Sequence, residues 1–243
     1  MKHSYYIKAL LIVAALGFIG IVYVSSRDKT GSYYYIAMDY DRQMSMKRIP
    51  VNEGNIKKVR FYFEKAHQSA PKNVNILYAY GNFLYQYNFI EKAKNYYRMA
   101  FKLEKDKTKL YQILFATLHD GVNVEKEYLQ AFDTSEIALE FYPDDVTILN
   151  GLAWFYATAN IKRLQSPKKA LKYAKLAVKL SDRKDPAILD TLAAAYYINF
   201  EYQKAVDIQK EALNKIDSDK DGYQKKLNQY IYALNQQKTT SKE

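Results

Sequence analysis

The chain has 243 residues, of which 49% are hydrophobic and 26% charged, and its formal net charge is +11. This length fits one or two domains, and this hydrophobic content excludes a chain that is disordered throughout. Because the chain has no cysteine, disulfides, thiolate catalysis and cysteine-ligated metal centres are excluded. With only five Pro and eight Gly, the composition disfavours a turn-rich β fold and favours helices.

The N-terminal region carries an uninterrupted apolar run, Ala9–Val24. As a helix it is roughly 24 Å long, shorter than a hydrocarbon core of about 30 Å, but aromatic and aliphatic flanks extend it to Ser4–Ser26. We therefore predict a transmembrane signal anchor within residues 1–29 that contacts the lipid bilayer through residues 4–26. A cleaved secretory signal is an alternative, since Val24-Ser25-Ser26 offers tolerated residues before a cut, and a buried core helix is a third.

The charges on the two sides of the apolar run are nearly balanced. Lys2 and Lys8 precede it, and Arg27, Lys29 and Arg42 follow it. We expect a single-pass membrane protein with the N-terminus inside and the C-terminal domain extracytoplasmic, because the short N-terminal tail is charged and long domains are translocated despite their own charges.

Residues 30–54 are interpreted as a linker with a degenerate element. The segment SYYYIAMDYDRQ shows no clean helical or strand period. Pro50, Asn52 and Gly54 then mark a break before the next element.

From residue 55 onward, similar segments recur, and each is typical of two amphipathic helices. The first helices carry a small residue where a neighbour crosses, at Gly81, Ala153 and Ala193. The second helices carry pairs of small residues seven positions apart: Val59 and Ala66, Ala93 and Ala100, Ala131 and Ala138, Ala170 and Ala177, Ala205 and Ala212. Small side chains at this spacing allow an adjacent helix to approach closely.

The joints between these segments carry helix-start signals. Asp144 and Asp145 follow Pro143 and are expected to cap the next helix, where negative charge suits the helix dipole. Pro186 is expected at the first position of a later helix, where its missing N–H costs nothing.

These residues resemble the tetratricopeptide repeat (TPR) family, whose period is near 34 residues with small and aromatic positions in both helices. The matching units are 74–107, 112–145, 146–183 and 186–218. The resemblance implies an all-α superhelix of antiparallel helix pairs, with about four full repeats, a partial N-terminal one and a C-terminal capping helix. It places the repeat domain at 55–236 and a disordered tail at 237–243, and it identifies the chain as similar to membrane-anchored bacterial-type TPR proteins.

No constellation with catalytic or metal-binding spacing is found. His3, His67 and His119 lie in three different segments. We therefore expect no catalytic residues, no metal, no cofactor and no small-molecule substrate. An enzyme with an unrecognised site in Tyr35–Asn55 is retained as an alternative from a different functional class. Nucleic-acid binding is not expected despite the basic charge, because a membrane segment is present and no base-reading motif is found.

The inner face of such a superhelix is lined by the first helices. The residues beside their packing stripe are the candidates for partner contact: Asn75, Tyr78, Asn82, Tyr85, Thr147, Asn150, Trp154, Asp190 and Tyr197. Aromatic rings and amides suit an extended peptide or an inserted helix. Trp154 is the single Trp; it is a candidate hot spot, and tight packing between repeats is the equal alternative.

A basic stripe follows the helical period at Lys168, Lys172, Lys175 and Lys179. It is interpreted as a solvated face, with contact to an anionic lipid surface as the sharper hypothesis.

Together these features predict a membrane-anchored scaffold that binds a peptide or protein partner in its concave groove, with a role in cell-envelope assembly. A cleaved, soluble exported TPR binding protein is the alternative.

Overall fold

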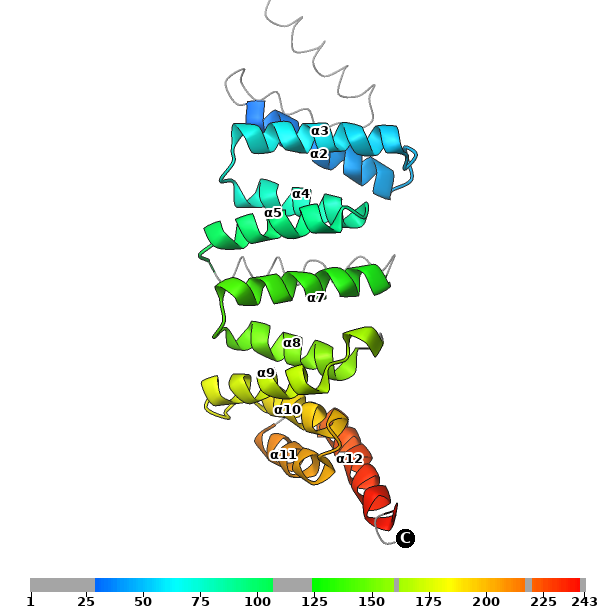
Figure 1. Ribbon diagram of the computed structural model, residues 1–243, viewed down its shortest axis with the longest axis vertical. Coiled ribbons are helices and arrows are strands. Elements are labelled where there is room, and N and C mark those ends of the chain that lie inside the picture. Colours follow the sequence, from blue (N-terminus) through cyan, green and yellow to red (C-terminus); the bar gives the residue numbers. More distant parts are fainter. Residues whose placement is uncertain (1–28, 107–123, 160–161, 217–219, 241–243) are drawn as a thin grey trace, which may run out of the picture. The chain divides into compact units, whose positions relative to one another are not determined.

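The structure is a computed structural model that describes residues 29–106, 124–159, 162–216 and 220–240 (Figure 1). The chain divides into two compact units, Met1–Ile113 (unit 1) and Leu114–Glu243 (unit 2), and each is described by itself. All regular structure within these ranges consists of ten α-helices and one short 3-10 helix. The predicted all-α class is therefore confirmed for the described part of the chain.

Unit 1 contains two helix pairs. Helix α2 (Lys29–Ser45) packs against α3 (Glu53–Ser69), and α4 (Val74–Gln86) packs against α5 (Ile90–Leu103). In each pair the two helices run antiparallel and are joined by a short connection, as Figure 1 shows. Helix α3 also contacts α4, so the two pairs share one core.

Aromatic side chains fill the core of unit 1. Phe63 of α3 stacks on Tyr80 of α4 with ring centroids 5.1 Å apart, and its ring lies 5.5 Å from that of Phe83. Tyr97 of α5 is fully buried and passes α4 at Gly81. A Cβ built on Gly81 would lie 2.6 Å from Tyr97 Cε1, a distance that real atoms do not adopt. The close crossing of α4 and α5 therefore depends on this glycine.

Asparagine side chains start two of these helices. The Asn52 side chain accepts a hydrogen bond from the backbone N–H of Asn55 (2.8 Å) at the start of α3. Asn73 accepts from the backbone N–H groups of Asn75 (3.1 Å) and Ile76 (3.3 Å) at the start of α4. These bonds satisfy donors that the first helical turn leaves without intrahelical partners.

The expectation of a linker with a degenerate element at residues 30–54 is wrong for most of its length. Lys29–Ser45 forms the regular helix α2, so the N-terminal repeat expected to be partial is a complete pair. Ala37 and Met44 of this helix are buried. The sequence did not show the helical period because tyrosines occupy the flanks of the buried stripe. Tyr33, Tyr34 and Tyr40 are half-buried, which blurs the contrast between apolar and polar faces.

Unit 2 begins, in its described part, with α7 (Val124–Phe141). Two antiparallel pairs and a final helix follow: α8 (Val146–Thr158) with α9 (Pro167–Leu180), α10 (Pro186–Ile198) with α11 (Tyr202–Lys215), and α12 (Lys220–Thr240), as Figure 1 shows. A 3-10 turn, Lys162–Leu164, lies between α8 and α9. Helix α10 packs on both α8 and α9, and α12 packs on α11.

The small residues predicted on the second helices all lie in the core. Each of the ten is at most 1% exposed, and the three small residues of the first helices are buried as well. The predicted spacing of seven therefore marks the packed faces correctly in both units.

The predicted helix starts of unit 2 are also confirmed. Asp145 accepts a hydrogen bond from the backbone N–H of Thr147 (3.1 Å) at the start of α8. Pro186 occupies the first turn of α10 as predicted, and Asp185, which precedes it, accepts a hydrogen bond from the backbone N–H of Ala187 (2.8 Å). These capping bonds fix where each first helix begins.

The C-terminal helix is longer than expected. A capping helix ending at residue 236 and a disordered tail at 237–243 were predicted, but α12 continues to Thr240. Gln237 donates a hydrogen bond to the backbone carbonyl of Phe200 (3.4 Å), which supports the extra turn. The buried face of α12 joins one hydrophobic cluster with α10 and α11: Ala193, Ala205, Val206, Leu227, Tyr230 and Leu234.

Several predictions fall outside the described residues. They are the anchor at residues 4–26, the start of the repeat at 112–145, and His3 and His119. Among the helices of the described ranges, none has the length and apolar character needed to cross a membrane.

Candidate functional site

The nine residues predicted to line the inner face differ in exposure. Four are exposed: Asn75, Asn82, Thr147 and Trp154. Two are half-buried: Asn150 and Tyr197. Three are buried: Tyr78, Tyr85 and Asp190. The expectation that these last three face an open groove is therefore wrong.

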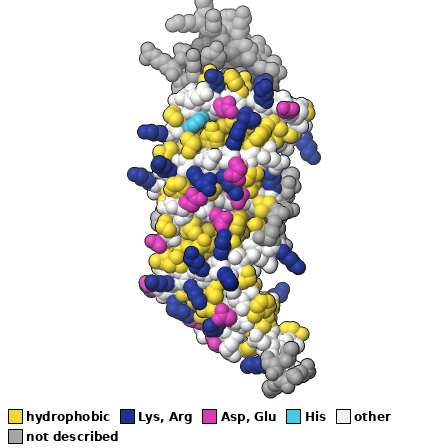
Figure 2. All heavy atoms as spheres, in the orientation of Figure 1, with side chains coloured by type: hydrophobic (Ala, Val, Ile, Leu, Met, Phe, Trp, Pro, Cys, Tyr) yellow, Lys and Arg dark blue, Asp and Glu magenta, His cyan; other side chains and the backbone are white. Residues whose placement is uncertain are grey.

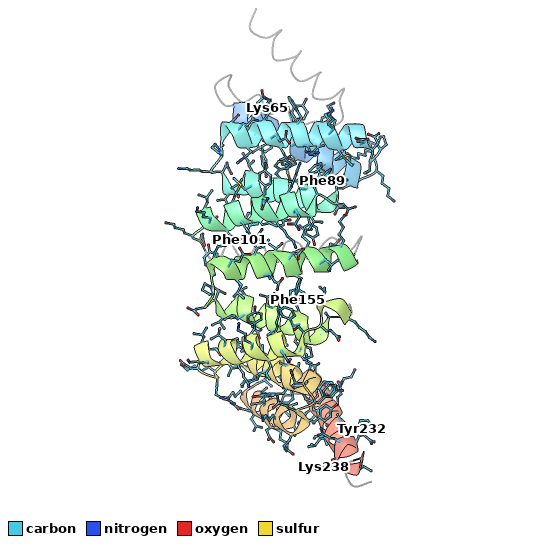
Figure 3. The ribbon with its side chains drawn as sticks, in the orientation of Figure 1. Lys65, Phe89, Phe101, Phe155, Tyr232 and Lys238 are labelled. Atoms are coloured by element: carbon cyan, nitrogen blue, oxygen red, sulfur yellow. The ribbon has the colours of Figure 1, made fainter. Side chains whose placement is uncertain are left out.

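The burial of Tyr78 has a direct cause in the crossing of α4 and α5. Its ring is 6.0 Å from that of Tyr97 and meets that of Phe101, labelled in Figure 3, edge-on at 5.4 Å. Because Gly81 brings α5 so close to α4, a ring one turn earlier on α4 is covered as well. The prediction that Tyr78 faces the groove had assumed that the second helix of a pair covers only the stripe of small residues on the first helix.

Trp154 on α8 remains accessible. Its side chain is 36% exposed. The ammonium nitrogen of Lys226, from α12, lies 4.5 Å from the centroid of the indole ring, within the range of a cation–π interaction. The indole is therefore oriented by a contact from a helix some 70 residues later in the chain, while part of its surface stays open to solvent.

A buried polar network holds Lys226 in this position. Its Nζ donates to Oδ2 of Asp190 at 2.5 Å. Gln209 Nε2 donates to the other carboxylate oxygen at 2.9 Å and to the carbonyl of Tyr223 at 3.2 Å. Because Asp190 lies on α10, Gln209 on α11 and Lys226 on α12, the network fixes the register of the last three helices.

Asn150 lies one helical turn before Trp154 on α8. Its Oδ1 is buried, and no group in the described part of the chain donates a hydrogen bond to it. Leaving a buried acceptor without a hydrogen bond costs free energy. Residues four apart share one helix face, so this acceptor and the indole lie on the same side of α8.

The same surface continues onto α12. Tyr197 of α10 contacts the rings of Tyr202 at 5.5 Å and Tyr230 at 4.8 Å. Gln229 donates a hydrogen bond to the Tyr197 hydroxyl (3.3 Å). We call this surface of unit 2 the first-helix face, and it consists of Thr147, Asn150, Trp154, Tyr197, Lys226 and Gln229.

Two members of the first-helix face, Lys226 and Gln229, were not predicted. Both lie on α12, which was predicted only as a capping helix. The many Lys and Gln side chains of this segment were the available signal. Without the fold, however, nothing in the sequence indicated that Lys226 reaches back across α10 to the indole of α8.

The basic stripe on α9 lies at the surface as expected. Lys168, Lys172, Lys175 and Lys179 are all exposed. On the face seen in Figure 2, Lys and Arg side chains are interspersed with acidic and hydrophobic ones and are not gathered into one patch. Contact of the stripe with an anionic surface stays a prediction.

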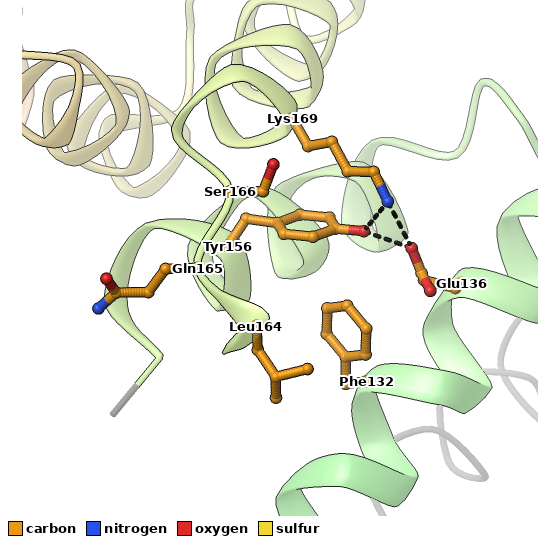
Figure 4. Close-up of a pocket in the computed structure, with 7 residues that line it drawn as sticks. All are labelled: Phe132, Glu136, Tyr156, Leu164, Gln165, Ser166 and Lys169. Atoms are coloured by element: carbon orange, nitrogen blue, oxygen red, sulfur yellow. Dashed lines mark hydrogen bonds and ion pairs between the residues drawn. The ribbon is translucent and has the colours of Figure 1, made fainter. Parts of the chain in front are cut away.

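A cavity of about 350 Å³ lies beside the loop that precedes α9 (Figure 4). It is lined by Phe132, Glu136, Tyr156, Leu164, Gln165, Ser166 and Lys169. The Tyr156 hydroxyl donates to Glu136, and Lys169 Nζ donates to both at 2.8 and 3.3 Å. Burial raises the pKa of the Tyr156 phenol, so this group stays protonated and keeps donating.

This cavity was not predicted from the sequence, although the longer connection between α8 and α9 was an available signal. Three of its polar side chains, Glu136, Tyr156 and Lys169, bind one another, as Figure 4 shows. The cavity therefore specifies a ligand less clearly than the first-helix face does.

Histidine and carboxylate positions give no sign of a metal centre in the described ranges, where no group of three or more potential ligands is found. His67, the one histidine in those ranges, meets the Tyr96 ring edge-on at 5.4 Å. The site that remains is a surface of rings, amides and one ammonium group.

No protein-family model matches the chain, and no curated protein matches its sequence. Its structure is similar to a thermophilic TPR protein of Thermus thermophilus, with 17% identity over 84% of this chain and 98% of that one and a TM-score of 0.35. It is also similar to MamA (residues 41 to the end) of Desulfovibrio magneticus RS-1, with 17% identity, 80% and 100% coverage and a TM-score of 0.41. It is similar as well to PilF of Pseudomonas aeruginosa, with 15% identity over 90% of this chain and 100% of that one and a TM-score of 0.38. Likenesses at these levels carry no functional argument, so the function is argued from the side chains of this chain.

Proposed function

We propose that this protein is a binding scaffold that holds a peptide or protein partner on the first-helix face of unit 2. The observation that carries the proposal is Trp154, an indole that is oriented by Lys226 and yet remains 36% exposed. Tryptophan is enriched among the residues that dominate protein interfaces, and an oriented ring loses little side-chain entropy on binding. A ring or aliphatic side chain of the partner packs on the open part of the indole.

The partner is an extended segment or a helix with an apolar anchor. The half-buried amide side chain of Asn150 lies one turn from the indole and contributes polar surface beside that anchor. Gln229 and Thr147 supply further polar contacts at the rim. This combination of a central aromatic anchor and peripheral amides is the usual composition of a peptide-binding groove.

In this proposal the scaffold acts at a membrane, with the C-terminal domain extracytoplasmic. The support is the apolar run Ala9–Val24 with its flanks, which extends the segment to residues 4–26. Such a tether raises the local concentration of the scaffold near membrane partners, so individual contacts can be weak. A role in assembling the cell envelope follows from that location. N-terminal sequencing of the mature protein tests the tether, since a start after residue 26 would show that the segment is cleaved.

The binding surface is tested by photo-crosslinking in intact membranes. A photoreactive amino acid is placed at Thr147 in the full-length chain, which leaves Trp154 intact, and at Leu180 in a matched control. Thr147 is exposed on α8, whereas Leu180, 40% exposed, lies at the end of α9, a second helix. We expect a discrete crosslinked species from position 147 that position 180 does not give. Equal crosslinking at both positions, or none at 147, would refute the first-helix face as the binding surface.

A further inference from the structure

The outer flank of the first helix pair carries a stack of tyrosine rings. Tyr62 of α3 stacks between two tyrosines of α2, with ring centroids 6.4 Å from Tyr33 and 6.3 Å from Tyr40. It also meets Phe61 edge-on at 5.5 Å. All these contacts stay within α2 and α3. The adjacent ring, Phe63, is fully buried and contacts Tyr80 and Phe83 of α4 as well as Tyr34 of α2, so the two neighbouring residues point to different sides of α3.

Cationic side chains accompany this stack. Lys58 Nζ lies 4.2 Å from the centroid of the Tyr40 ring and donates to its hydroxyl at 2.5 Å. Lys65, labelled on α3 in Figure 3, has its Nζ 5.7 Å from the centroid of Phe61, whose side chain is 51% exposed. We call this surface the tyrosine face, and it consists of Tyr33, Tyr40, Lys58, Phe61, Tyr62 and Lys65.

The charge of the whole helix pair is also basic. Residues 29–69 contain eight Lys or Arg and four Asp or Glu, a surplus of four positive charges. Tyrosine rings with lysines beside them are the side chains that favour the interface between lipid headgroups and acyl chains, and a positive surplus favours an anionic membrane surface.

The position of the pair in the chain points to the same partner. The apolar run ends at Val24, and α2 begins at Lys29, so four residues separate them. Even fully extended, that connection spans at most about 18 Å. If the run lies in a bilayer, the start of α2 therefore lies within about one headgroup layer of the membrane surface.

We propose that the tyrosine face docks on the interface of an anionic bilayer and so orients the repeat units relative to the membrane. The rings enter the headgroup region, and Lys58 and Lys65 contact anionic headgroups. This inference rests on the membrane tether of the proposed function, but it is independent of the first-helix face.

The test uses the absence of native cysteine, which makes single-cysteine spin labelling clean. Full-length Phe61→Cys is labelled and reconstituted in nanodiscs of phosphatidylcholine, with and without 30% phosphatidylglycerol. Tyr35→Cys is the matched control, because Tyr35 is 58% exposed and lies on α2 roughly 200° around the helix from Tyr33. Accessibility of each label to oxygen and to a water-soluble nickel complex reports its contact with lipid or water.

We expect the label at 61 to be shielded from nickel and accessible to oxygen when phosphatidylglycerol is present, and the label at 35 to stay aqueous. In the Phe61→Cys background, Lys58→Gln with Lys65→Gln should abolish the lipid dependence. Lys210→Gln with Lys225→Gln removes the same charge from exposed positions of α11 and α12 and should leave it unchanged. Circular dichroism of each variant verifies that the fold is retained.

Three results would overturn the inference. The first is equal accessibility of the labels at 61 and 35 in anionic nanodiscs. The second is dipolar coupling between two labels at 61, which would show that a second copy covers the face. The third is a protein that leaves the nanodiscs on size exclusion, which refutes the tether and this inference with it. In the first two cases the chain stays with the nanodisc, so the tether stands while the docking fails.

Discussion

Helix α4 of unit 1 and helix α8 of unit 2 occupy the same place in their pairs but expose different chemistry. Both begin at an N-cap side chain, and each carries a small residue where its second helix crosses, Gly81 in α4 and Ala153 in α8. One turn before that residue α4 has the buried Tyr78, and α8 has the half-buried Asn150. The small residues thus determine the pairing, while the large residues beside them decide whether the face is core or binding surface.

The largest expected effect separates the roles of two aromatic residues. Tyr78→Ala should lower the free energy of unfolding by about 3–5 kcal/mol, because it removes a buried ring packed on Tyr97 and Phe101. Trp154→Ala should cost no more than about 1 kcal/mol and weaken partner binding on the order of 30-fold or more. Urea unfolding followed by far-UV circular dichroism measures the first quantity, and titration with the crosslinked partner measures the second.

Equal losses of stability in the two variants would show that Trp154 is a core residue. In that case the indole is packed between repeats, and the first-helix face loses its anchor. Tyr78→Phe serves as the control, since it keeps the ring and should retain most of the stability that Tyr78→Ala loses.

Two glycines on first helices, Gly81 and Gly151, should respond to alanine with opposite signs. Gly81→Ala should destabilise unit 1 by about 1–3 kcal/mol, because the new methyl group collides with the buried Tyr97 ring. Gly151→Ala should stabilise unit 2 by up to about 1 kcal/mol, because a Cβ there has nothing within 4 Å and alanine favours helix. Thermal unfolding of the full chain provides the comparison, with Trp154 fluorescence reporting on unit 2 alone. Stabilisation by both substitutions would contradict the tight crossing of α4 and α5.

Asp41 of unit 1 and Asp190 of unit 2 both hold a carboxylate largely away from solvent, but within the described ranges only Asp190 has a cationic partner. Burial raises the pKa of Asp41 in α2 to about 6 from 3.8, although a hydrogen bond with Tyr87 opposes the shift, and its Oδ1 accepts no hydrogen bond within the described ranges. A carboxyl group whose pKa is higher in the folded than in the unfolded state destabilises the fold when it is ionised. The free-energy cost of the ionised Asp41 therefore grows between about pH 4 and pH 6 and is complete above that range.

Asp41→Asn should accordingly stabilise unit 1 at pH 7 by about 2 kcal/mol, somewhat less than the full shift implies because the site relaxes. The gain should disappear below about pH 4, where aspartic acid is protonated in both states. Asp190→Asn should instead destabilise unit 2 at pH 7 by about 1–2 kcal/mol, since it removes the negative charge that pairs with Lys226 and leaves one oxygen for two donors, Lys226 and Gln209. Unfolding free energies of both variants from pH 3 to 8 test the contrast, and a gain for Asp41→Asn that does not change with pH would contradict its basis.

The sequence predicted the repeat architecture more fully than the candidate site. Alanines at a spacing of seven, together with Asp145, Asp185 and Pro186, reflect local chemistry that the fold preserves, so the helix pairs from residue 55 onward were predictable. Helix α2 was missed because half-buried tyrosines hide the amphipathic period.

The binding surface depends on contacts between residues far apart in the chain. Trp154 could be identified as a candidate because a single tryptophan stands on a first helix. Lys226 could not, because its role requires α12 to fold back so that one ammonium group meets both Asp190 and the indole. Similarly, the burial of Tyr78 follows from the distance between α4 and α5, which no local pattern encodes.

The smallest expected effect concerns the turns that end two first helices. Asn88 and Phe200 each stand two residues beyond a first helix, and both have a left-handed backbone, with φ of 67° and 61°. Asparagine tolerates this conformation, whereas a phenylalanine there is strained by about 1 kcal/mol. Phe200 is 70% exposed, so little burial is lost on replacing it. Phe200→Asn should therefore stabilise unit 2 by about 1 kcal/mol, and Asn88→Phe should destabilise unit 1 by a similar amount. Trp154 fluorescence during urea unfolding measures the change in unit 2. A loss of stability in Phe200→Asn would show that the exposed ring contributes more to the fold than the backbone strain costs.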